Sequence, residues 1–438
     1  MAECMKRLLL IGVLYALPLF AKGVYSFQEL LRATKEHSPQ LLQKRLQTDM
    51  AKSDLDIAKS LYYPTLSLSA TSQYGHKFKD TYAPSSVGDD SLTQATQYQS
   101  STSLNLNYEI TKFGATQASI DAAKHKVNAF AFEECAFLEK LLQSLVNNYQ
   151  QVRVMDKKLQ SFSKIQHAYE ELYTRAKRLF NSGMISQSEV SNYALELAEV
   201  LTNIAQAKEQ KLYALAELRY ISGVELQETT VFQPYETQFD SLHVKSFEES
   251  FEANQMKSQI EQKRELLKAE QRAYFPTLSL FGRYDAYGYD KDTFAKSMGD
   301  VQENGYRIGV SLYWNLFDGF KREAAIKRRL LELEEAKVAF VEAKRVYAKE
   351  QEILNSLAIK KEDELNKQGK NRAIAEELAS MSQRLYTSGE IDRLASIKSL
   401  IVYHENLLKE EEAKEELSMI KMKQMIKQEG VNRCAIVD

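Results

Sequence analysis

The hexapeptide YPTLSL at residues 63–68 returns as FPTLSL at residues 275–280, an offset of 212 residues. A second pair of segments, RLFNSG at 178–183 and RLYTSG at 384–389, is separated by 206 residues. Because two unrelated segments keep nearly the same offset, the whole half of the chain is duplicated. A repeat of roughly 200 residues is far longer than a solenoid repeat, so we expect two large, equivalent halves that lie side by side.

In each half, the repeated proline is followed by an alternation of apolar and polar residues, which predicts paired β-strands. The two strand hairpins are expected at about 64–109 and 276–315. One face of these strands is apolar, and it comprises Leu66, Leu68, Leu278, Leu280, Ile308, Val310 and Leu312. The other face is polar, and it comprises Ser67, Asn105, Ser279, Arg283, Asp285 and Arg307.

Three features favour strands of an outer-membrane barrel over a soluble sheet domain with the same alternation. The expected strands are about ten residues long, which suits a tilted strand that crosses a bilayer. Tyrosines and Trp314 gather at the strand ends, as in the aromatic girdles of such barrels. Both hairpins also end in long polar loops, at 76–97 and 289–304. We therefore expect the apolar face to contact lipid and the polar face to line a lumen.

The N-terminus predicts export. Lys6 and Arg7 precede an apolar run at 8–20 that ends at Ala21, the pattern of a secretory signal peptide at 1–21. This run is too short to span a bilayer as a helix, and no later segment is apolar enough to do so. Cleavage after Ala21 fits the pattern, although the site itself is left open.

Long helices follow each hairpin. Residues 115–181 lack Pro and Gly, and 321–388 contain only Gly369, with apolar residues at spacings of three and four. This spacing is typical of a coiled-coil seam, and a helix of some 65 residues measures about 100 Å. Each helix ends at a glycine suited to a left-handed turn, Gly183 or Gly389, and a return helix follows.

The organisation expected from these patterns has five parts. They are a signal at 1–21, a first repeat at 22–225, a connector at 226–247, a second repeat at 248–427 and a tail at 428–438. Four strands cannot close a membrane barrel, whose smallest closed forms have about eight. Three chains would supply twelve strands and cyclic symmetry, so a homotrimer is expected.

Composition argues against several other classes of function. The net charge of −2 gives no indication of nucleic-acid binding. Neither a catalytic or cofactor-binding motif nor a metal-ligand spacing is recognisable, so we expect no enzyme, no cofactor and no metal. Cys135 and Cys434, the cysteines beyond the signal, are expected to be unpaired thiols, with a disulfide as the alternative.

These features together resemble the TolC family of outer membrane efflux proteins. The resemblance rests on the signal, the two proline-led strand segments, the LFDG segment at 316–319 and the paired RL(F/Y)xxG segments. It implies a mainly α-helical channel-tunnel with duplicated halves, a shared 12-stranded trimeric barrel and long periplasmic coiled-coil helices. It also implies a homotrimer in the outer membrane of a Gram-negative bacterium. The partners would be a periplasmic adaptor and an inner-membrane transporter, either a resistance-nodulation-division pump or an ABC exporter. The cargo would be drugs, toxic compounds or proteins.

The resemblance also assigns site residues. The two turns that would meet the adaptor comprise Gly183, Met184, Ile185, Ser186, Gly389, Glu390 and Ile391. The periplasmic entrance would comprise Glu189, Arg393 and Lys398. Well-known relatives have acidic residues six and nine positions after the second turn glycine, where this chain has Ala395 and Lys398, so paired aspartate rings are not expected. An exported coiled-coil scaffold or an adaptor without its own pore is the alternative reading.

Overall fold

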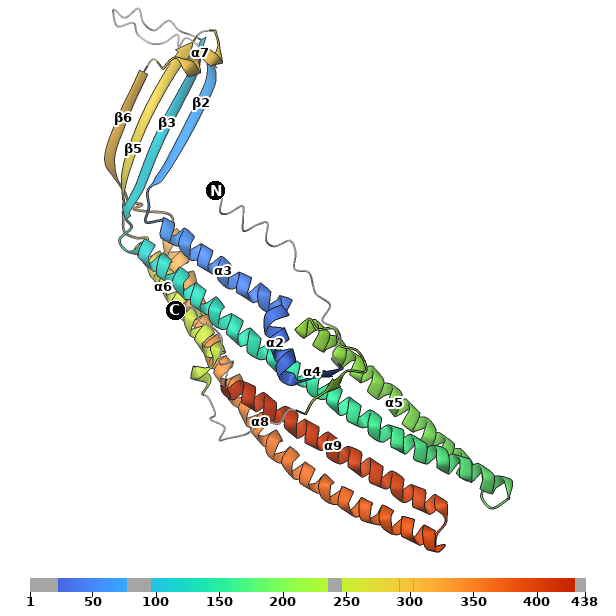
Figure 1. Ribbon diagram of the computed structural model, residues 1–438. Helices are drawn as coiled ribbons and strands as arrows, with labels where there is room; N and C mark the ends of the chain where they lie inside the picture. The colour runs from blue at the N-terminus through green and yellow to red at the C-terminus, as the bar shows by residue number, and fades with distance from the viewer. Residues whose placement is uncertain (1–22, 77–95, 235–245, 291, 302, 430–438) are drawn as a thin grey trace, which may run out of the picture. The chain divides into compact units, whose positions relative to one another are not determined.

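The computed structural model describes residues 23–76, 96–234, 246–290, 292–301 and 303–429. The predicted signal, most of the first polar loop and Cys434 lie outside these ranges. The elements, shown in Figure 1, are β1 (Val24–Tyr25), α2 (Phe27–His37), α3 (Pro39–Ser60), β2 (Thr65–His76), β3 (Thr96–Thr111), α4 (Ala115–Asn181), α5 (Gln187–Ser222), β4 (Val231–Phe232), η1 (Phe247–Glu249), α6 (Phe251–Arg272), β5 (Thr277–Asp290), α7 (Phe294–Gly299), β6 (Glu303–Tyr313), α8 (Lys321–Ser388) and α9 (Arg393–Glu429).

The chain divides into two compact units. The helical unit comprises 1–46, 131–254 and 342–438, and the sheet unit comprises 47–130 and 255–341. Helices α3, α4, α6 and α8 each contribute residues to both units. Each unit therefore draws on both halves of the duplicated sequence.

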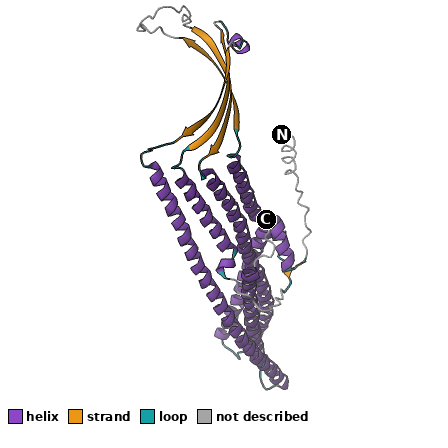
Figure 2. Cartoon of the chain, turned by 90° about the vertical axis from the view of Figure 1, so that its left-hand side faces the viewer, coloured by secondary structure: helices purple, strands orange, loops and turns teal. Residues whose placement is uncertain are grey.

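The sheet unit is built on four antiparallel strands in the order β2-β3-β5-β6, which lie side by side in one curved sheet (Figure 2). Pairing of β3 with β5 joins the two halves of the duplication into one sheet. The register is continuous except for a bulge between Glu109 and Thr111. Since residues directly opposite each other share a face, this register carries the alternation of the sequence across all four strands.

The mainly helical fold with duplicated strand hairpins is confirmed. Helices α4 and α8 have the bounds expected from their lack of proline. Helix α2 ends at His37, two residues before Pro39, because proline disfavours helix at the residue before it, here Ser38. None of the described helices combines the length and the apolar character needed to cross a membrane.

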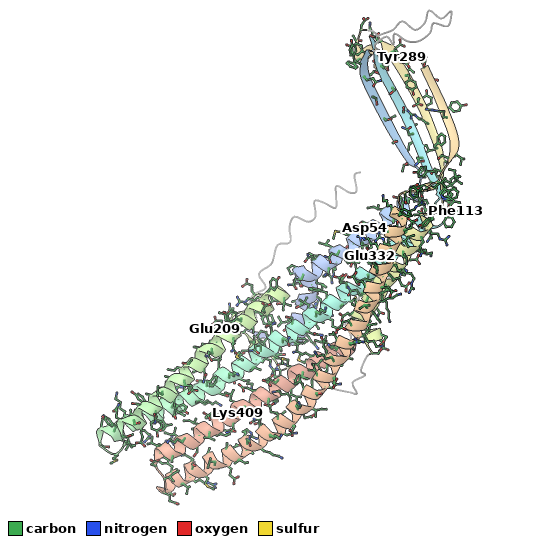
Figure 3. The ribbon with its side chains drawn as sticks, turned by 180° about the vertical axis from the view of Figure 1, so that it is seen from behind. Asp54, Phe113, Glu209, Tyr289, Glu332 and Lys409 are labelled. Carbon is green, nitrogen blue, oxygen red and sulfur yellow. The ribbon has the colours of Figure 1, made fainter. Side chains whose placement is uncertain are left out.

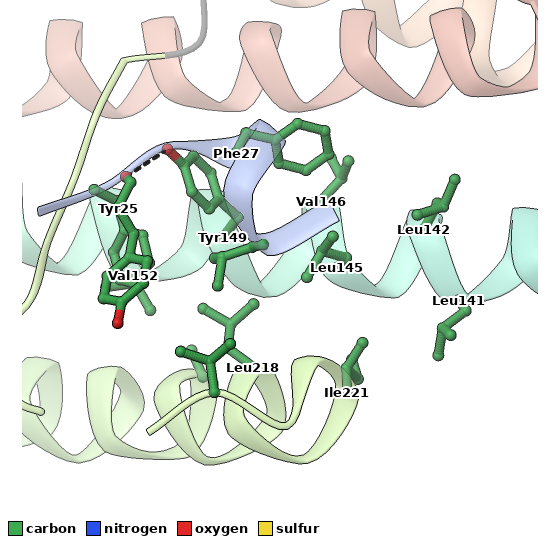
Figure 4. Close-up of a cluster of buried hydrophobic side chains, with 14 of the residues drawn as sticks. Tyr25, Phe27, Leu141, Leu142, Leu145, Val146, Tyr149, Val152, Leu218 and Ile221 are labelled. Atoms are coloured by element: carbon green, nitrogen blue, oxygen red, sulfur yellow. Dashed lines mark hydrogen bonds between the residues drawn. The ribbon is translucent and has the colours of Figure 1, made fainter. Parts of the chain in front are cut away.

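The core of the helical unit is centred on Tyr149 of α4, which is fully buried (Figure 4). Its ring packs edge-on against Phe27, at 5.4 Å between ring centroids, and against Phe232, at 5.0 Å. Its hydroxyl donates a hydrogen bond to the carbonyl oxygen of Gln233 at 2.7 Å, and burial raises its pKa to about 12. Tyr149 thus stays neutral and joins α2, α4 and the strand β4 region.

One expectation from the sequence is wrong. Cys135 is not an unpaired thiol: it is buried in α4 and its sulfur is disulfide-bonded. A disulfide requires two Cα atoms within about 7 Å, and the spacing of cysteines along a chain does not reveal that distance.

Candidate functional site

The polar residues singled out in the sequence lie on one face of the sheet. The register pairs Ser67 with Asn105, Asn105 with Arg283 and Arg283 with Arg307, so these four side chains form a row across all four strands. Ser279 lies on the same face and pairs with Ser311. The expected grouping of lumen-side residues therefore corresponds to a single surface of the sheet.

A charged cluster occupies the middle of this polar face. The Asp285 carboxylate accepts a hydrogen bond from the Ser103 hydroxyl at 2.5 Å and from Arg283 Nε at 2.6 Å. Arg307 binds the second carboxylate oxygen at 3.2 Å. Asp285 is 5% exposed, so its charge is held by groups of β3, β5 and β6. Because the Asp285 carboxylate binds Ser103 and both guanidinium groups, it links β3, β5 and β6 and stabilises their register.

The opposite face is apolar and open. Its pairs include Leu66 with Leu106, Leu280 with Val310 and Leu278 with Leu312. Leu68 is 70% exposed and Ile308 is 75% exposed. Soluble monomers rarely show a continuous apolar surface of this kind, which marks a contact with lipid or another protein.

Aromatic residues lie at both ends of the strands. Figure 3 shows Phe113 and Tyr289 at opposite ends of the sheet. The Phe113 ring lies 5.8 Å from that of Phe275, and Trp314 Nε1 donates to the carbonyl oxygen of Tyr274 at 3.0 Å. The amphipathic tyrosine and tryptophan rings at these levels fit the two interfaces of a membrane.

The sheet has two edges without a partner strand among the described residues. Strand β2 pairs only with β3, and β6 pairs only with β5. Backbone groups at such edges are left to pair with another chain.

The two helical hairpins end in turns of the same type. Gly183 has a φ of +76° and Gly389 a φ of +81°. After Gly183, the amide of Met184 donates to the carbonyl of Leu179 at 2.9 Å, and Glu390 donates to Leu385 at 2.9 Å in the second hairpin. The amides of Gly183 and Gly389 donate to the carbonyl oxygens of Phe180 and Tyr386. Each pair of hydrogen bonds forms a Schellman motif at the end of its helix.

The residues after the glycines differ in exposure. Met184 is 73% exposed, whereas Ile185 packs against the apolar cluster between α4, α5 and α9. Ser186 caps α5: its hydroxyl accepts from the Glu189 amide at 3.2 Å, and the Glu189 carboxylate accepts from the Ser186 amide at 3.2 Å. Glu189 is thus engaged in a capping box within its own helix.

Arg393, expected at the entrance, links two hairpins. Its guanidinium forms a bidentate ion pair with Glu171 of α4, at 2.9 and 3.1 Å, and lies over the Tyr386 ring at 5.2 Å. The hydrogen bonds from Arg393 hold the pKa of Glu171 below its usual value. Arg393 therefore pairs with Glu171.

Lys398 lies against α5. Its ammonium is 5.1 Å from the centre of the Tyr193 ring, and a hydrogen bond with Tyr193 raises its pKa. Lys398 therefore carries a full positive charge at neutral pH. Ala395, three residues earlier on α9, is exposed.

Reasoning from the sequence did not single out Glu171 or Tyr193, the residues that position Arg393 and Lys398. Both lie on long helices rich in similar residues, so only their spatial neighbours distinguish them. In the ranges that the structure describes, no three His, Cys, Asp or Glu residues are placed to hold a metal ion.

Comparison with known proteins identifies the architecture. Residues 30–224 match the family described as Outer membrane efflux protein. No curated protein sequence matches this one. The chain shares its fold with the CmeC outer membrane channel of Campylobacter jejuni, at 15% identity and a TM-score of 0.79, over 92% of this chain and 85% of that one.

Two further structures have the same fold. The outer membrane protein VceC of Vibrio cholerae matches at 15% identity and a TM-score of 0.77, over 92% of this chain and 96% of that one. The MtrE outer membrane channel of Neisseria gonorrhoeae matches at 13% identity and a TM-score of 0.71, over 92% and 88%. Part of this chain, residues 30–224, therefore matches the outer membrane efflux protein family, and the chain shares the fold of the three outer membrane proteins named above.

Proposed function

We propose that this protein is one protomer of a trimeric channel-tunnel in the outer membrane of a Gram-negative bacterium. It provides a passive exit duct for a tripartite efflux or secretion system. One observation carries the proposal: a four-stranded sheet with an apolar face, a polar face and two edges that no described strand covers. The match of residues 30–224 to the outer membrane efflux protein family supports the same conclusion.

The open edges supply the argument for a trimer. In lipid every backbone amide and carbonyl must be paired, so an open four-stranded sheet cannot span a membrane alone. Two chains would close a barrel of eight strands, whose interior is filled by side chains, whereas three chains close twelve strands around a wider lumen. The charged polar face, with Arg283, Asp285 and Arg307 at its centre, fits a water-filled lumen of the wider barrel.

The helical hairpins supply the argument for a partner protein. A passive channel needs an energised transporter, and the exposed turns at Met184 and Glu390 offer compact, rigid ends for a periplasmic adaptor. The transporter behind the adaptor is a resistance-nodulation-division pump or an ABC exporter, and the cargo is a drug, another toxic compound or a protein. Because the lumen residues are generic polar groups, we assign the choice of cargo to that transporter.

The trimer and the pore are tested together. The full chain is extracted from outer membranes with detergent, and its mass is measured by native mass spectrometry. It is then added to planar lipid bilayers. We expect a trimer that conducts ions. Monomers or dimers without conductance, released from the cell envelope without detergent, would instead favour a scaffold or adaptor that has no pore.

A further inference from the structure

The short helix α7, in the loop between β5 and β6, lies on the apolar face of the sheet. A Cβ atom built on Gly288 would lie 2.0 Å from the carbonyl oxygen of Ser297, so α7 covers the side towards which residue 288 points. Residues of alternate positions share a face, so Gly288 faces the same way as Tyr284 and Leu280. Leu280 is on the face that the proposed function assigns to lipid.

The side chains on this face of the sheet change from apolar to polar under α7. Towards the ends of the strands that join the helices, the apolar face is rich in leucine, isoleucine and valine. Under α7 this face carries hydroxyl groups. The hydroxyl oxygens of Ser72 and Ser100 form a hydrogen bond of 2.8 Å, and those of Ser100 and Ser297 of α7 form one of 2.7 Å. Ser100 is 8% exposed and Ser297 is 2% exposed. Polar groups that face hydrocarbon without partners are costly, and α7 both covers and satisfies this row.

Aromatic stacking fastens α7 in this position. The rings of Tyr74 on β2 and Tyr98 on β3 have centroids 5.0 Å apart. The Phe294 ring of α7 lies 4.3 Å from Tyr98, edge to face. The helix is therefore attached to the sheet by rings on one side and by the Ser100–Ser297 hydrogen bond at its centre.

Large apolar side chains of α7 and of the residues that follow it are exposed, beside the exposed Lys296. Met298 is 62% exposed, Val301 is 54% exposed and Phe294 is 44% exposed. Met298 and Val301 line a pocket with Ala70 and Ala286, and Ala286 lies on the same face as Tyr284, two residues earlier on β5. Leu280 and Gly288 are eight residues apart on β5, or roughly 26 Å along a strand. At the usual tilt this is about 20 Å along the membrane normal, which places Gly288 near the far end of the roughly 25 Å apolar band of such barrels.

We propose that α7, together with Val301 that follows it, is an interfacial anchor that holds Phe294, Met298 and Val301 in the head-group layer of the outer leaflet. Its partner is the lipid surface, and the proposal rests on the proposed function, which assigns the apolar face to lipid. Short amphipathic helices bind in this layer with their apolar side buried about 5 to 10 Å. Its place at the end of the lipid-facing band distinguishes this role from a contact with a second copy of the chain.

Quenching of tryptophan fluorescence by brominated lipids tests the anchor. The full chain is reconstituted in phosphatidylcholine vesicles with bromine near either the glycerol end or the methyl end of the acyl chains. Trp314 is the only tryptophan in the chain, so Trp314→Phe removes the background signal. Met298→Trp then reports on α7, Val310→Trp on the middle of the apolar face, and Ser311→Trp on the polar face.

We expect the shallow bromine to quench Met298→Trp about twofold more strongly than the deep bromine does. Val310→Trp should be quenched more by the deep bromine, and Ser311→Trp by neither. Quenching of Val310→Trp without quenching of Met298→Trp would overturn the anchor and leave the channel intact; a blue-shifted emission would then place a neighbouring copy over α7. If Val310→Trp also escapes quenching, the lipid face is wrong and the anchor fails with it.

Discussion

The two turn glycines, Gly183 and Gly389, end the repeated segments RLFNSG and RLYTSG and adopt the same left-handed backbone conformation. A Cβ atom at either position would meet no atom within 4 Å. Space is therefore available for a side chain, and the positive φ alone selects glycine. The requirement belongs to the turn and would hold for any pair of helices joined in this way.

We expect Gly389→Val to weaken docking to the adaptor while the amount of protein in the outer membrane stays unchanged. A left-handed conformation costs an L-residue roughly 1–2 kcal/mol, and a β-branched residue more, so the turn should rearrange. Adaptor cross-linking and drug resistance measure the loss. Thr387→Val, two residues earlier in α8, is the matched control. Normal cross-linking and resistance with Gly389→Val would refute a docking role for this turn.

At Gly288 the reason for glycine is different. The carbonyl oxygen of Ser297 leaves no room for a side chain there, and no positive φ is involved. Gly288→Ala should displace α7 from the sheet and, by loosening the helix, speed cleavage by trypsin after the exposed Lys296. Gly305→Ala, in the same hairpin with no atom within 4 Å of its Cβ position, should leave cleavage at Lys296 unchanged. Equal cleavage rates in the two variants would mean that α7 is not held by contact with Gly288.

At the scale of elements, the two faces of β5 should tolerate charge differently. Leu280→Arg places a guanidinium on the lipid side, where it costs about 2 to 4 kcal/mol near the bilayer midplane. Ser279→Arg places it on the polar side, beside Glu109 and Ser311. The fraction of chain assembled as trimer in the outer membrane should therefore fall more with Leu280→Arg. Equal tolerance, or the reverse order, would mean that the faces are misassigned.

The contact between α4 and α9 should depend on pH. The pKa of Glu171 in the fold lies below its ordinary value of 4.5, so its pair with Arg393 stabilises the fold above that pH. The stabilisation is lost as the pH falls through the folded pKa. The Glu171 side chain is 37% exposed, so solvent screens the pair and we expect only about 0.5–1 kcal/mol.

Hydrogen exchange of the α9 amides between Arg393 and Ile401 measures this contact. Glu171→Gln should speed exchange roughly two- to fivefold at neutral pH, and the difference from the unmodified protein should shrink below pH 4.5. Glu170→Gln is the control, since Glu170 bonds to Gln166 of its own helix. A difference that persists in acid would assign the effect to packing and not to charge.

At the scale of the whole molecule, threefold symmetry would multiply the charge of Lys398. Three ammonium groups near a constriction disfavour multivalent cations. We therefore expect polyvalent cations on the periplasmic side to block conductance weakly, and Lys398→Asp to strengthen the block in planar bilayers. Lys409→Asp, eleven residues further along α9, changes the same charge farther from the turn and should have little effect. Tight block of the unmodified channel would show that carboxylates line the entrance.

The sequence by itself determined the elements and their faces. Residues 115–181 form one helix because neither proline nor glycine interrupts them, and proline at 64 and 276 separates helix from strand. Alternation along β5 and β6 assigned Leu280 and Arg283 to opposite faces before the register was known. These are local properties, set by backbone conformations that each residue adopts with its nearest neighbours.

Only the tertiary structure decided which elements meet. Arg393 pairs with Glu171, 222 residues away, because α4 and α9 pack with those faces together. The sequence alone did not distinguish Glu171 from the many other carboxylates along the helices. The disulfide of Cys135 and the cover that α7 provides over Ser100 have the same origin. Periodicity sets which residues share a face of an element, but the rotation of one element against another is set by the packing of the whole fold.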